Sequence, residues 1–162
     1  MGRPARNYSL NFCRLNWASP RKASDMTTDS DITVYLSFHH PRRRAEEVTA
    51  ALRIDPELCR DRGVARNTPY GGALAGRHPE TYWITELPIF DDMGLAKAVT
   101  EQLDRLEPQR DFTRAWADGG GRVELEIYWK VTRVFHTELP HTLLQRLAEF
   151  GMGIELHPMG AQ

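Results

Sequence analysis

At 162 residues, of which 41% are hydrophobic and 27% charged, the chain fits one globular domain, and it has no apolar run long enough for a membrane-spanning helix. The formal net charge is −1, but segment 1–25 carries five basic residues and one acid, so the chain from Met26 onward is acidic. That acidity argues against a protein that follows a nucleic-acid backbone, because such proteins need a basic surface.

Residues 1–31 are expected to form a disordered basic extension. They lack the apolar core of a secretory signal peptide, and their scattered apolar residues follow no helical or strand period. A transit peptide and an upstream start codon with Met26 as the natural start are both open interpretations, and we favour the second. Cys13 and Cys59 share no motif, so we expect no bridge between them and a cytoplasmic location.

The folded part is expected to begin at Ile32. Alternation over residues 32–38 predicts a half-buried strand, and helical spacing over 42–53 predicts a helix that ends before Pro56. Residues 60–80 are rich in glycine and read as a long loop. A short strand over 82–85 follows.

The second half of the chain has clearer patterns. An apolar stripe from Leu95 to Leu106 predicts a helix, with one or two further turns after Pro108. Residues 122–132 carry the strongest strand alternation in the chain. A last helix over 140–150 and a short strand over 154–156 complete the order β-α-β-α-β-α-β.

This order predicts an α+β fold with a single sheet of about four strands and helices packed on one face. We expect two ferredoxin-like β-α-β units with an extra central helix. The domain is expected to span 32–158, with residues 159–162 as a C-terminal tail.

Several motifs occur together along this domain, and their arrangement resembles a known family. They are His40-Pro41-x4-Glu46-Glu47-Val48-Thr49-x2-Leu52, Tyr82-Trp83, Leu103-x2-Leu106-Glu107-Pro108 and Leu144-x2-Leu147-Ala148-x-Phe150-Gly151-x-Gly153-Ile154-x-Leu156. Together they resemble the bacterial family called domain of unknown function 4279 over residues 32–158. The resemblance implies a small intracellular bacterial protein and carries over no catalytic residue. An immunity-like role as inhibitor of a partner protein is suggested by analogy of context.

No motif predicts catalysis, a cofactor or a metal site. Adjacent His39 and His40 point to opposite faces of a strand, and no histidine has the spacing of a zinc motif. The glycines at 119–121 follow a helix and precede a strand, the reverse of a phosphate-binding loop. Glu124 and Glu126 lie on one strand face and would suit acid–base catalysis only in a cleft, so we favour a solvated outer face.

The aromatic residues indicate a binding surface. If Trp83 and Trp129 fill the core, alternation places Tyr82 and Tyr128 on the opposite face of the sheet, with Tyr35. Glu124 and Glu126 share that face, which should repel nucleic acid and suit a basic protein partner.

The leading hypothesis is therefore a non-enzymatic protein-interaction module, acting as a monomer or homodimer without nucleic acid or membrane. Its expected binding residues are Tyr35, Tyr82, Glu124, Glu126 and Tyr128. The alternative is a small-molecule anion-binding protein or small enzyme with a site under the 60–80 loop. The candidates for that site are Arg62, Arg66, Arg77 and His78.

Overall fold

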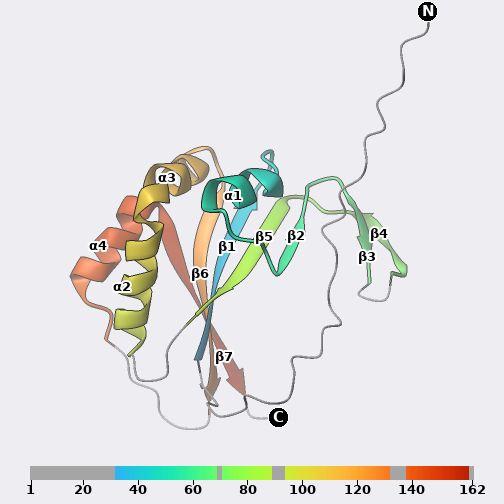
Figure 1. Cartoon of the computed structure of the whole chain (residues 1–162). Helices are drawn as coiled ribbons and strands as arrows, with labels where there is room; N and C mark the ends of the chain where they lie inside the picture. Colours follow the sequence, from blue (N-terminus) through green and yellow to red (C-terminus); the bar gives the residue numbers. More distant parts are fainter. Residues whose placement is uncertain (1–31, 69–70, 89–93, 132–137, 161–162) are drawn as a thin grey trace, which may run out of the picture.

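The computed structural model describes residues 32–68, 71–88, 94–131 and 138–160 of the chain (Figure 1). Within these ranges, five strands form one mixed sheet in the order β2-β5-β1-β6-β7. They are β1 (Ile32–His40), β2 (Leu58–Arg60), β5 (Thr81–Leu87), β6 (Arg122–Val131) and β7 (Met152–Gly160). The β1 strand is antiparallel to both of its neighbours, whereas β6 and β7 are parallel.

The helices pack on one face of this sheet (Figure 1). They are α1 (Ala45–Leu52), α2 (Leu95–Leu106), α3 (Arg110–Asp118) and α4 (His141–Phe150), with a 3-10 turn over Glu107–Gln109 between α2 and α3. Every second residue of β1 faces them, and Leu36 and Phe38 are fully buried. Because side chains alternate along a strand, the other residues of β1 lie on the opposite face of the sheet.

Two polar contacts fix how the helices sit on the sheet. The buried indole of Trp83 on β5 donates a hydrogen bond of 3.0 Å to the Thr49 hydroxyl on α1. The indole of Trp116 on α3 donates 2.9 Å to the backbone oxygen of His39, at the end of β1. Both tryptophans thus fill the core while their N–H groups remain satisfied, as buried indoles usually require.

The expected α+β class is confirmed, but the expected sheet is not. The sheet has five strands rather than about four, because the short β2 pairs with β5 through Cys59 and Trp83. The second expected β-α-β unit exists as β6-α4-β7, with its strands parallel and adjacent. The first does not, because β1 and β5 are antiparallel neighbours rather than a parallel pair.

The expected long loop over residues 60–80 is also wrong as stated. It contains β3 (Ala65–Asn67) and β4 (Ala73–Arg77), which pair as a separate two-stranded sheet beside the main one (Figure 1). Both strands are exposed along their whole length. A hairpin that buries neither face has no reason to alternate apolar and polar residues, so its sequence lacks the usual strand pattern.

Other boundaries differ by smaller amounts. The helix after Pro108 runs to Asp118, and the last strand covers nine residues instead of three. Cys59 is disulfide-bonded, so the expectation of unbridged cysteines is wrong for this residue. Cys13, like all of the expected extension 1–31, lies outside the described residues. The expected cytoplasmic location therefore loses its support from the cysteines and stays a prediction.

None of the helices in the described part of the chain combines the length and apolar character needed to cross a membrane.

Candidate functional site

The face of the sheet opposite the helices carries most of the predicted binding residues, and we call it the polar face. Its register follows from the strand pairing: Tyr35 lies beside Glu126, and Glu126 lies beside Glu155 on β7. Directly paired residues on one face of a sheet have Cβ atoms about 5 Å apart, so these side chains are neighbours. The polar face includes Thr33, Tyr35, Ser37, His39, Leu58, Arg60, Tyr82, Ile84, Glu86, Arg122, Glu124, Glu126, Tyr128, Glu155 and His157.

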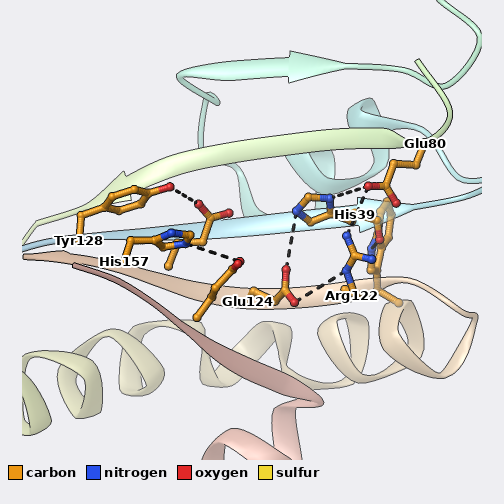
Figure 2. A network of polar contacts seen from close by, with 9 residues as sticks. His39, Glu80, Arg122, Glu124, Tyr128 and His157 are labelled. Carbon is orange, nitrogen blue, oxygen red and sulfur yellow. Dashed lines mark hydrogen bonds and ion pairs between the residues drawn. The ribbon is translucent and has the colours of Figure 1, made fainter. Parts of the chain in front are cut away.

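One end of the polar face holds a closed charge network (Figure 2). The Arg122 guanidinium lies 3.3 Å from Glu80 Oε1 and 3.7 Å from Glu124 Oε1. The His39 ring lies between the same carboxylates, with Nδ1 3.1 Å from Glu80 and Nε2 3.7 Å from Glu124. An arginine thus bridges two carboxylates, and the chain supplies the counter-charge for Glu124 itself.

The other end of the polar face centres on Glu126, which is 5% exposed. The Tyr128 hydroxyl donates a hydrogen bond of 3.0 Å to Glu126 Oε2. The His157 ring stacks on Tyr128 at 4.4 Å and lies 3.6 Å from Glu155 Oε2 through Nε2. Figure 2 shows Tyr128 and His157 side by side, away from the Arg122 network. Among the described residues, neither Glu126 nor Glu155 pairs with a lysine or an arginine.

Aromatic rings border both ends of the polar face. Tyr35 contacts Tyr128 edge to face at 5.6 Å, and Tyr82 lies 4.8 Å from the His39 ring. The Arg60 guanidinium lies 4.8 Å above the Tyr82 ring, a cation–π geometry. The predicted residues Tyr35, Tyr82 and Tyr128 therefore share one face, and Glu126 lies among them rather than on a solvated surface.

Burial sets the protonation of the two tyrosines nearest Glu126. Burial, followed by the hydrogen bond to Glu126, raises the pKa of Tyr128 to about 12. Burial, followed by the charge of Glu126, raises the pKa of Tyr82 as well. Both phenols therefore stay neutral near pH 7 and remain hydrogen-bond donors.

A further buried polar group belongs to this face. Ser37 is fully buried, and its register partners are Ile84 on β5 and Glu124 on β6. Its hydroxyl has no hydrogen-bond partner in the described part of the chain. Buried hydroxyls without partners are uncommon in native proteins, so this one calls for an explanation.

The alternative site has a different character. Arg62 donates to the Pro41 carbonyl at 2.9 Å, and Arg77 donates to the Gly63 carbonyl at 2.6 Å. Burial lowers the pKa of His78, with further lowering from the charges of Arg60 and Arg66. Arg77 thus ties the end of β4 to the segment before β3, and Arg62 ties that segment to the chain after β1. Across the described residues, no group of three or more His, Cys, Asp or Glu side chains is arranged to hold a metal ion.

The sequence analysis did not identify several residues of the polar face. Glu155 lay inside the expected strand over 154–156 but was not assigned to this face, and His157 lay beyond that strand. His39 was considered only as a metal ligand, and its contact with Glu80 joins residues 41 positions apart. Arg122 begins the strongest predicted strand, so alternation already indicated the face of the sheet on which it lies. The sequence did not indicate which two carboxylates it bridges.

The comparisons with known proteins give a family and nothing more specific. The family model described as domain of unknown function (DUF4279) matches residues 30–160, so the chain belongs to this family and the resemblance seen in the sequence is confirmed. No curated protein and no solved structure matches the chain. The expected bacterial origin stays a prediction.

Proposed function

Since membership of this family assigns no activity, we propose that the domain is a protein-interaction module whose polar face binds a basic segment of a partner protein. The observation that carries the proposal is the pairing of Glu126 with Glu155 in neighbouring strands. Two carboxylates side by side repel each other, and no lysine or arginine of the described chain compensates them. A basic partner would supply the missing positive charge.

The composition of the face supports the same proposal. Five carboxylates lie on or beside it, against the guanidinium groups of Arg60 and Arg122, so acidic groups outnumber basic ones among the described side chains of this face. Complementary charge speeds encounter with a basic partner and rejects acidic ones, including nucleic acid. Tyrosine side chains supply contact area at low entropic cost and are enriched at interfaces. The five carboxylates are Glu80, Glu86, Glu124, Glu126 and Glu155.

An inhibitor of a partner protein is one form that such a module can take. The polar face would inhibit its partner by covering a basic surface that the partner needs for its own function. This finer proposal rests on charge complementarity alone.

The anion-binding alternative has weaker support. Its positive charge gathers around His78, where Arg60 and Arg66 are close enough to lower the histidine pKa. However, Arg62 and Arg77 already donate to backbone carbonyls. We therefore prefer the polar face.

The experiment is a quantitative pull-down from lysate of the cells that make the protein, using the tagged full chain. The test variant replaces Glu126 and Tyr128 with alanine. The control variant replaces Leu144 and Glu149, two exposed residues of α4 on the helix side, with alanine. We expect one near-stoichiometric basic partner that the control retains and the test variant loses by about tenfold or more. Equal recovery by test variant and wild type, with both folded by circular dichroism, would exclude this face.

A further inference from the structure

We propose that Glu126 and Glu155 form a subsite for the guanidinium group of one arginine of the partner protein. This inference rests on the proposed function and deepens it, because it names the side chain that the polar face recognises. The subsite consists of the two carboxylates, the hydroxyl and ring of Tyr128, and the neighbouring ring of Tyr35.

The polar face itself contains the template for this subsite. At its other end, Arg122 lies 3.3 Å and 3.7 Å from two carboxylates, next to the His39 ring. The Glu126 end repeats the arrangement, with two carboxylates next to the stacked rings of Tyr128 and His157. What differs is the arginine: the chain provides one at the first end, and among the described residues it provides none at the second.

The burial of Glu126 is the second step of the argument. A carboxylate that is 5% exposed has lost most of its hydration, and a single hydrogen bond from Tyr128 replaces only part of it. Buried charges are normally paired with a cation or bound to a metal. No ion pair of Glu126 occurs in the described part of the chain, and an arginine of the partner protein would supply the cation that a buried carboxylate normally has.

An independent observation on the same face also points to a missing ligand. The Ser37 hydroxyl is fully buried and has no hydrogen-bond partner among the described residues, and its register partner Glu124 lies two residues before Glu126 on β6. A group carrying several N–H donors, seated over the carboxylates, would bring a donor toward this region of the face. The guanidinium has five such donors.

The geometry favours a guanidinium over an ammonium. A guanidinium is planar, stacks on aromatic rings, bridges carboxylates with its fork of donors and is weakly hydrated. The Glu126 end offers flat rings and two carboxylates in register, of which Glu126 is 5% exposed and the Glu155 side chain 52% exposed. The same face already holds a guanidinium over a tyrosine, with Arg60 4.8 Å from the Tyr82 ring.

The test is a nuclear magnetic resonance titration of the ¹⁵N-labelled full chain with N-acetyl-arginine methylamide, and in parallel with N-acetyl-lysine methylamide. We expect saturable shifts of the amides around Glu126 and Glu155, with a Kd in the millimolar range that is about tenfold lower for the arginine probe. Glu126→Gln keeps the acceptor for Tyr128 but removes the charge, and should raise the arginine Kd by about tenfold or more. Glu149→Gln, the same change on α4, should leave it within about twofold.

Thermal unfolding of the same variants separates binding from folding. Because Glu126 is a buried charge without a cation, Glu126→Gln should unfold at the same or a higher temperature than wild type while it loses the probe. A lower unfolding temperature together with unchanged probe binding would show a purely structural carboxylate and overturn the inference.

Three other results would also overturn it. Equal binding of the two probes would remove the arginine assignment. Absence of shifts in wild type would remove the subsite. Binding only to a variant whose five basic residues in 1–25 are changed to glutamine would make the chain's own N-terminal segment the occupant. None of these results decides the proposed function, because the pull-down reports on the whole face and does not depend on these probes.

Discussion

Tyr128 and Glu126 lie two residues apart on the same face of β6, and the Tyr128 hydroxyl donates a hydrogen bond of 3.0 Å to the Glu126 carboxylate. The carboxylate is almost enclosed, yet it has no arginine or lysine beside it in the described part of the chain. The two residues are therefore expected to have different effects on the stability of the domain. Tyr128 stabilises the folded domain, whereas the charge of Glu126 is useful only when a cation arrives.

The hydroxyl of Tyr128 should contribute to stability. Tyr128→Phe removes the donor to a buried carboxylate and should lower the free energy of unfolding by about 1 to 3 kcal/mol, measured by urea denaturation. Tyr82→Phe is the matched control, because the Tyr82 hydroxyl makes no hydrogen bond within the described residues. That control should change the free energy by no more than about 0.5 kcal/mol. Equal losses in the two variants would contradict this account of Tyr128.

His40 should make stability fall at acidic pH. Its Nδ1 accepts hydrogen bonds of 2.9 Å from the backbone N–H groups of both Arg42 and Arg43, which requires an unprotonated nitrogen. Burial, followed by the charge of Arg43, lowers the His40 pKa despite the opposing effects of the Gly119 backbone and the charge of Glu47. The unfolded chain therefore takes up this proton first, so the contribution is complete above about pH 6.5 and is lost as pH falls through the folded pKa.

The measurement for His40 is the free energy of unfolding between pH 8 and pH 5 for wild type and His40→Asn. The Asn side-chain oxygen can accept the same hydrogen bonds but does not titrate. Wild type should lose more stability than the variant over this range. Parallel profiles would mean that His40 has no part in the pH dependence.

Gly121 should tolerate no side chain. A Cβ at this position would lie 2.6 Å from the buried Trp116 ring and 2.7 Å from the His39 carbonyl oxygen. Gly121→Ala should therefore destabilise the domain by about 1 to 3 kcal/mol through overpacking. Gly153→Ala, whose Cβ would meet only Glu124 Cγ at 3.8 Å, should stay within about 0.5 kcal/mol in the same urea experiment. A neutral Gly121→Ala would show that the ends of α3 and β1 move apart easily.

The Trp83–Thr49 hydrogen bond ties α1 to the sheet and has its own test. Thr49→Val keeps the shape but leaves the buried indole N–H without an acceptor, which should cost about 1 to 3 kcal/mol. Thr49→Ser keeps the hydroxyl and should retain most of that stability. If the valine variant is as stable as the serine variant, the hydrogen bond contributes nothing measurable.

The elements that sequence analysis located are those with one buried face. The residues of β6 alternate because Leu125 and Ile127 enter the core while Glu124 and Glu126 lie on the polar face, and this alternation is visible in the sequence. The β3–β4 hairpin buries neither face and leaves no such pattern. The antiparallel pairing of β1 with β5 was missed because an α-helix between two strands usually indicates a parallel crossover.

The polar face was partly predictable for the same reason. Alternation places Tyr82 and Tyr128 opposite Trp83 and Trp129 in the sequence alone. It says nothing about which strands are neighbours, so the proximity of Glu126 to Glu155 required the parallel register of β6 and β7. The contact between His39 and Glu80 likewise depends on how β5 begins beside the end of β1.

The most direct test of the central claim is site-specific photo-crosslinking of the full chain in lysate of the cells that make it. The crosslinker p-benzoylphenylalanine replaces either Thr33, which pairs with Tyr128 on the polar face, or Leu144, which is 46% exposed on α4. The account predicts a crosslink to one basic protein from position 33, absent from position 144 and lost when Glu126 and Tyr128 are changed to alanine. The same proteins crosslinked from both positions, or a crosslink from position 33 that survives the double replacement, would contradict a binding role for the polar face.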